Sequence, residues 1–139
     1  MDRSFAITFE RILRAEGQGK PARTVEVFGW LIIIEGAIIL VAPHFVASVL
    51  HLPEFQQQAA NYFRLVGLLV GGLGMLYIVS GRLNSLGFVF ASLLDRPLVP
   101  FIMMLLWYLD ILPWQLALAF SIQDLASFLW TLKTWRASL

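Results

Sequence analysis

The chain has 139 residues, of which 59% are hydrophobic and 14% charged, with a formal net charge of +1 and a mean hydropathy of +0.77. A soluble domain averages about 25% charged residues, so too few polar side chains remain here to cover a water-facing surface. The composition therefore favours a single all-α membrane domain, gives no support for nucleic-acid binding, and without cysteine excludes disulfides and thiolate metal sites.

Residues 1–23 form a mixed-charge arm ahead of the first apolar run. Apolar residues recur in it at helical spacing, with charged residues between them: Phe5, Phe9, Ile12 and Leu13. This pattern predicts an amphipathic helix that lies in the membrane interface and ends near Gly17, although a partner-binding helix has the same pattern. We expect no cleaved signal peptide, because the arm is too long and too mixed in charge.

Four membrane spans are predicted, each of the roughly 20 residues that a bilayer core requires at a rise of about 1.5 Å per residue. Their approximate ranges are 25–42, 62–80, 93–112 and 115–132. The third span ends firmly before Pro113, but its start is open. Residues 86–94 either continue it or lie in the membrane plane, and Arg96 is expected at the interface.

Lysine and arginine are distributed unevenly about these spans. Nine of the ten precede the first span, separate the second from the third, or follow the fourth: Arg3, Arg11, Arg14, Lys20, Arg23, Arg82, Arg96, Lys133 and Arg136. Cytoplasmic loops carry the excess of Lys and Arg, so both termini are predicted to lie in the cytoplasm.

Two carboxyl groups fall near the predicted membrane midplane. Glu35 follows eight uncharged residues of the first span, and Asp124 lies at a similar depth in the fourth. If they face each other, both cannot ionise in a low-dielectric site, and the pair could relay protons, act as acid and base, or bind an amine. The alternative is a structural role, with each acid hydrogen-bonded to a neighbouring helix.

Arg64 and Asp110 are predicted to form a structural ion pair. Both lie about two residues inside the outer membrane boundary, whereas Glu35 lies roughly 9 Å deeper than Arg64 at 1.5 Å per residue. Depth therefore favours Asp110 as the partner of Arg64.

Two helical faces are expected to pack against protein. The second span carries glycines on one face, which permit close helix–helix approach within the chain or between subunits: Gly67, Gly71, Gly74 and Gly81. The fourth span carries a polar stripe that should face protein or a wet cavity: Ser121, Asp124, Ser127 and Thr131.

Motifs for bound metals, phosphates or hydrolytic chemistry are absent from the sequence. His44 and His51 in the first loop are about 10 Å apart if they share one helix, which is too far for both to bind one metal. We predict no metal and no cofactor, with a haem axial ligand from either histidine as the alternative.

Parts of the chain resemble known families. The size, four spans and first-span glutamate are similar in topology to small multidrug-resistance transporters. The segments Arg64-Leu-Val-Gly67, Gly74-Met-Leu-Tyr77 with Arg82, and Asp95-Arg96-Pro97-Leu98-Val99 resemble small four-span bacterial membrane proteins of biphenyl-degradation operons. This second resemblance implies a bacterial cytoplasmic membrane and carries no activity with it.

Three functions follow as hypotheses. The first is an accessory or binding protein for a lipophilic molecule or a partner membrane protein, acting as an oligomer or as a subunit of a larger complex. The second is an intramembrane isomerase or cyclase with Glu35 and Asp124 as acid and base. The third is a proton-coupled oligomeric transporter. We favour the first, so an enzymatic activity is not the leading expectation.

Overall fold

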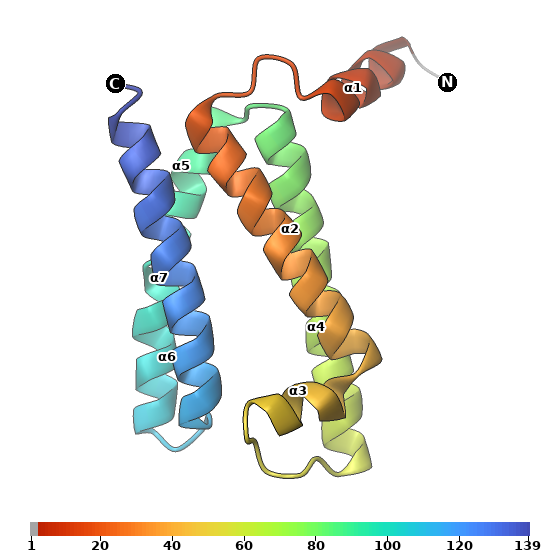
Figure 1. Ribbon diagram of the computed structural model, residues 1–139, viewed down its shortest axis with the longest axis vertical. Helices are drawn as coiled ribbons and strands as arrows, with labels where there is room; N and C mark the ends of the chain where they lie inside the picture. The colour runs from red at the N-terminus through yellow and green to blue at the C-terminus, as the bar shows by residue number, and fades with distance from the viewer. Residues whose placement is uncertain (1–2) are drawn as a thin grey trace.

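The computed structural model describes residues 3–139, and all regular secondary structure in this part of the chain is α-helical (Figure 1). The helices are α1 (Arg3–Arg14), α2 (Lys20–Val41), α3 (Pro43–Val49), α4 (Gln57–Arg82), α5 (Leu86–Asp95), α6 (Leu98–Tyr108) and α7 (Trp114–Arg136). Three helices of the described chain are long and apolar enough to cross a membrane: α2, α4 and the helix Leu86–Tyr108 that α5 and α6 form together.

The long helices are arranged as two antiparallel pairs. α2 packs along α4, and α6 packs along α7 (Figure 1). The two pairs approach each other at the end that carries α5 and both termini, and they diverge toward the opposite end, where α3 lies across the space between them. A proline begins α3 and another precedes α7, positions where its fixed φ and missing N–H are compatible with a helix start.

The α2–α4 contact is built from small residues spaced seven apart on each helix. The antiparallel partners are Ala22 with Gly81, Gly29 with Gly74, and Gly36 with Gly67. A Cβ atom added to any of the five glycines would lie 2.5–2.8 Å from a backbone oxygen of the other helix. The predicted glycine face therefore packs within one chain, and its partners on α2 are small residues that the sequence analysis had not singled out.

Gly71 takes part in this contact differently from its neighbours. A Cβ atom added to Gly71 would meet nothing within 4 Å. A Cβ atom added to Gly36, however, would lie 2.6 Å from the backbone nitrogen of Gly71. The glycine needed for close approach at this level is therefore Gly36.

The start of the third predicted span, which the sequence left open, lies in a helix that the structure describes. Residues 86–94 belong to α5, which continues through Arg96 and Pro97, both in right-handed helical conformation, into α6. Ser85 caps the start by accepting a hydrogen bond from the Phe88 amide at 3.4 Å. The helix therefore begins near residue 86 and ends near 108. Arg96 is buried inside the bundle, and its depth in a membrane stays a prediction.

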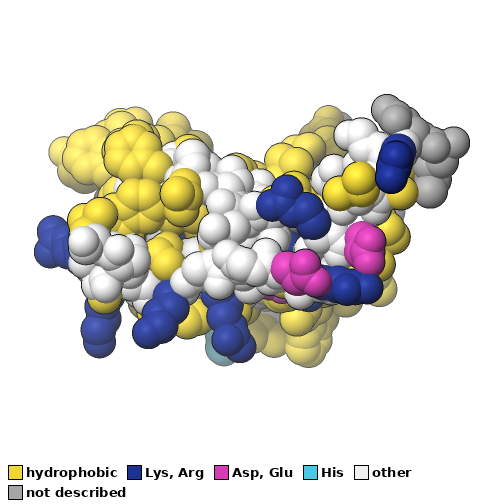
Figure 2. Space-filling model, turned by 90° about the horizontal axis from the view of Figure 1, so that it is seen from above, with side chains coloured by type: hydrophobic (Ala, Val, Ile, Leu, Met, Phe, Trp, Pro, Cys, Tyr) yellow, Lys and Arg dark blue, Asp and Glu magenta, His cyan; other side chains and the backbone are white. Residues whose placement is uncertain are grey.

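The end that carries the termini is held together by polar contacts between helix ends and loops. Arg82 donates to Glu26 at 2.7 Å and to the Ile12 carbonyl at 3.2 Å, and Gln18 donates to the other oxygen of Glu26 at 2.6 Å. Asn84 accepts from the Gly19 amide at 3.1 Å. Figure 2 views this end and shows Lys and Arg side chains spread along its edge. These contacts fix where α1 leaves the bundle.

α1 is the helix that the sequence predicted in the N-terminal arm, and it extends away from the bundle (Figure 1). It buries none of its residues, and its large apolar side chains are exposed: Phe5, Ile7, Phe9 and Leu13.

Candidate functional site

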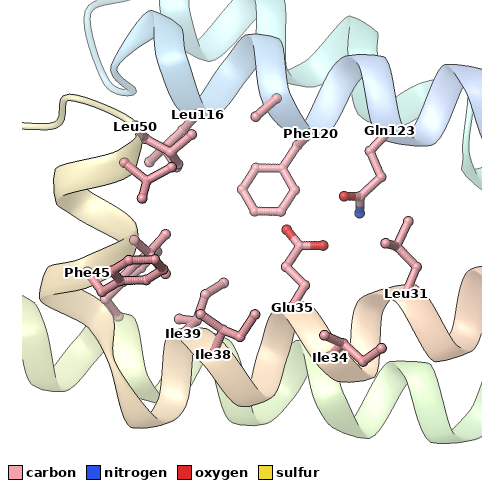
Figure 3. A pocket seen from close by; sticks show the side chains of 14 residues that line it. Leu31, Ile34, Glu35, Ile38, Ile39, Phe45, Leu50, Leu116, Phe120 and Gln123 are labelled. Carbon is pink, nitrogen blue, oxygen red and sulfur yellow. The ribbon is translucent and has the colours of Figure 1, made fainter.

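A groove of about 330 Å³ lies between the diverging helix pairs. One wall is α2 and the other is α7, with α3 closing one end (Figure 3), and Phe63 of α4 also contributes to the lining. The lining is apolar apart from two side chains, Glu35 and Gln123. A concave apolar surface with a few convergent polar groups is the usual form of a small-molecule site.

Glu35 points across this groove from α2 toward Phe120 and Gln123 of α7 (Figure 3). Its direction follows from its neighbour Gly36, which packs against α4, because successive helical residues are separated by about 100°. Glu35 is half-buried, and its Oε2 atom is shielded from solvent without a hydrogen-bond partner. A carboxyl oxygen left in this way costs free energy, and a donor brought by a ligand would offset that cost.

Asp124 faces a different environment from Gln123, the preceding residue. It is outside the lining of this groove and acts electrostatically on the buried guanidinium of Arg96. Asp124 and Glu35 are within electrostatic range of each other, but no hydrogen bond joins them in the described chain. The residue across the groove from Glu35 is Gln123 (Figure 3). Glu35 and Asp124, which were predicted as a pair, therefore lie in different surroundings: Glu35 lines the groove, and Asp124 interacts with Arg96.

Arg96 is the centre of a buried cluster that the sequence analysis missed. It is 1% exposed, its Nη1 donates to Thr131 Oγ1 at 2.9 Å, and its guanidinium lies 4.3 Å from the Phe28 ring centroid. Tyr77 lies beside it as a second ring, at 5.1 Å. The hydroxyl of Thr131 also shares a hydrogen bond of 2.7 Å with Thr24. The Nε and Nη2 atoms are buried without partners. In the sequence, this cluster was indicated by an arginine within an otherwise apolar helical segment.

Two residues of the polar stripe in the fourth predicted span are buried, and the other two, Ser121 and Asp124, are half-buried. Ser127 and Thr131 are 9% and 0% exposed, and Ser127 donates to the Asp124 carbonyl at 2.9 Å. Ser121 has a buried hydroxyl without a partner in the described chain.

Arg64 is not paired with Asp110. Its Nη1 donates to the Leu40 carbonyl at 2.7 Å and to the Val41 carbonyl at 3.3 Å. These are orphan carbonyls at the end of α2, where a cation is also favoured by the helix dipole. Asp110 is exposed in the α6–α7 turn with a φ of 56°. The ion pairs within residues 3–139 join Arg14 to Glu10 and Glu16, and Arg82 to Glu26.

The two histidines lie apart from the groove polar groups. His44 is exposed on α3, with its ring 6.4 Å from that of Phe55, and the backbone carbonyl of His51 accepts from Gln115 at 3.1 Å. No group of three or more His, Cys, Asp or Glu side chains that could hold a metal is found among residues 3–139.

Comparison with family models, curated proteins and solved structures gives no match. The class is therefore defined by the fold and the groove: a small helical protein with helices suited to a membrane and an apolar groove that contains a carboxyl group.

Proposed function

We propose that this chain is a four-span protein of a bacterial cytoplasmic membrane and that it binds a lipophilic molecule carrying a hydrogen-bond donor. The observation that carries the proposal is the unpartnered Oε2 of Glu35 inside an otherwise apolar groove. Ionisable groups at membrane depth are expensive, and their default interpretation is a functional site. Binding would occur in the plane of the bilayer, with the donor directed at Glu35 and Gln123.

The fourth span of this proposal is α7. Its 23 residues give a length of about 34 Å at 1.5 Å per residue. Its polar residues lower its hydropathy, but Ser127 and Thr131 are buried against protein, so they would not meet lipid. The large apolar side chains of α7 are exposed instead: Leu118, Ile122, Leu125 and Leu129.

Reporter fusions test the four-span arrangement. A green fluorescent protein fused after Leu139 is expected to fluoresce, because both termini would be cytoplasmic by the charge distribution. Alkaline phosphatase fused after Pro53 is expected to be active, and the same enzyme fused after Leu139 to be inactive. An active C-terminal phosphatase fusion would instead support three spans and refute the fourth.

α1 supports a further part of the proposal, an interfacial N-terminal helix. Its exposed apolar side chains lie on a helix whose remaining positions include Arg3, Arg11 and Arg14. Helices of this composition lie in the headgroup region of a bilayer. The contacts of Arg82 and Gln18 would hold α1 at that level.

Substitution of Glu35 tests the binding function. Glu35→Leu is expected to reduce the occupancy of octan-1-ol by about tenfold, since an ordinary hydrogen bond in an apolar site is worth on the order of 1–2 kcal/mol. The measurement is native mass spectrometry of the detergent-solubilised protein loaded with the alcohol. Ile38→Leu lines the same groove without changing its polarity, and it should bind as the unmodified protein does. Equal occupancy in the Glu35→Leu protein would refute the proposal.

The acid/base enzyme is less well supported by the same geometry. Such an enzyme needs both carboxyls on the wall of one pocket, whereas Glu35 lines the groove and Asp124 does not. The proton-coupled oligomeric transporter and an oligomeric or accessory role stay predictions.

A further inference from the structure

A second hollow, of about 470 Å³, adjoins the Glu35 groove on the side toward the termini. The two hollows share Leu31 of α2 with Ala119 and Gln123 of α7 as common walls. Figure 3 shows Leu31 and Gln123 facing each other at one end of the first hollow, which is where the second begins. The hollows are therefore successive parts of one groove between α2 and α7.

The combined groove is elongated. On α7 its lining runs from Leu116 to Trp130, which corresponds to about 21 Å at 1.5 Å per residue. Gln123 lies at the middle of this stretch. A compact ring system would occupy one hollow, whereas a flexible chain could follow both.

The polar groups are concentrated at the middle of the groove. The outer part, beyond Glu35 toward α3, is lined by apolar side chains such as Phe45 and Leu116. In the second hollow, Ser127 already donates to the Asp124 carbonyl, so its hydroxyl proton is not free for a ligand. Each end therefore suits mainly hydrocarbon, while Glu35 and Gln123 in the centre suit a hydrogen-bonding group of the ligand.

We propose that the ligand is an elongated, flexible lipophile that fills both hollows and carries its hydrogen-bond donor in mid-chain. This inference rests on the proposed function and specifies its ligand class. The donor binds Glu35 and Gln123, one hydrocarbon arm lies toward α3, and the other lies between Val27 and Ala126. A molecule with a terminal hydroxyl and one short chain needs only one hollow.

Filling the second hollow separates these two kinds of ligand. Ala126 is an exposed, small wall residue of that hollow, so Ala126→Phe occupies the space without disturbing a buried contact. The probes are hexadecan-8-ol, which has a mid-chain hydroxyl, and octan-1-ol, compared on the full-length detergent-solubilised protein by native mass spectrometry. The ratio of bound hexadecan-8-ol to bound octan-1-ol is expected to fall by about tenfold, because one arm loses its van der Waals contacts. Octan-1-ol occupancy itself should not change.

Leu125→Phe is the matched control, since Leu125 is exposed on α7 outside both hollows. It should leave the ratio of the two alcohols unchanged. Should Ala126→Phe fail to fold, Val27→Phe fills the same hollow from α2 and provides the same test. An unchanged ratio with octan-1-ol still bound overturns the elongated ligand alone. Failure of octan-1-ol to bind the unmodified protein overturns both this inference and the proposed function.

Discussion

Gly36→Ala is expected to destabilise the protein by about 1–3 kcal/mol, the usual cost of overpacking. Alanine is the better helix former by about 1 kcal/mol, so the intrinsic preference acts in the opposite direction. The steric effect should prevail, because the new Cβ would lie 2.5 Å from the Gly67 carbonyl oxygen and 2.6 Å from the Gly71 nitrogen. Both are backbone atoms, and they cannot move without separating α2 from α4. The measurement is thermal or denaturant unfolding in detergent.

Gly72→Ala is the matched control for this prediction. It makes the same chemical change in α4, but at a position where an added Cβ would meet nothing within 4 Å. It is therefore expected to be neutral or to stabilise the helix by up to about 1 kcal/mol. Gly71→Ala should behave in the same way, although its glycine belongs to the face that the sequence predicted to pack. Equal stability of the Gly36 and Gly72 variants would contradict the seven-residue packing of α2 on α4.

Arg96→Met is expected to cost about 3 kcal/mol of stability, in the range seen when one member of a buried charged cluster is removed. The change deletes the hydrogen bond to Thr131 and the contacts with the Phe28 and Tyr77 rings. It also leaves Asp124 without the cation that acts on it. Three helices lose a common contact, and unfolding in detergent should show a lower midpoint.

A double-mutant cycle identifies the electrostatic part of this loss. Asp124→Asn is expected to cost less in the Arg96→Met background than in the unmodified protein, with a coupling of about 1 kcal/mol or more. Arg136→Met serves as the control, because Arg136 is exposed near the C-terminus and should change stability by about 0.5 kcal/mol at most. Full additivity of the Arg96 and Asp124 changes would show that the two groups do not interact.

The positions of the long helices were largely predictable. Hydrophobic runs of sufficient length, ended by Pro43 and Pro113, located α2 and the boundary between α6 and α7. The exception was the start of the third predicted span, because Pro97 suggested that the chain reaches the membrane interface there. Pro97 lacks an N–H and therefore separates α5 from α6, but Arg96 and Pro97 both keep a right-handed helical conformation, so the chain runs from one helix directly into the other.

The proximity of Glu35 and Asp124 was predictable, but the directions of their side chains were not. The two carboxyls are within electrostatic range of each other. Which side chain of α7 lies opposite Glu35 depends on the rotation of that helix about its axis, and a rotation of about 100° exchanges Gln123 for Asp124. Arg64 illustrates the same limit, because the carbonyls at the end of α2 are backbone groups that no residue pattern reveals.

The amino-acid sequence by itself determined an all-helical chain with helices suited to a membrane, the approximate extents of its long helices and the glycine face of α4. These properties depend on composition and on local spacing along one helix. The tertiary structure alone decided that Gly29 and Gly36 are the partners of the α4 glycines and that Arg96 is buried. It also decided that Glu35 looks across a groove toward Gln123. The physical reason is that these contacts join residues far apart in the chain, and the relative rotation and divergence of packed helices determine them.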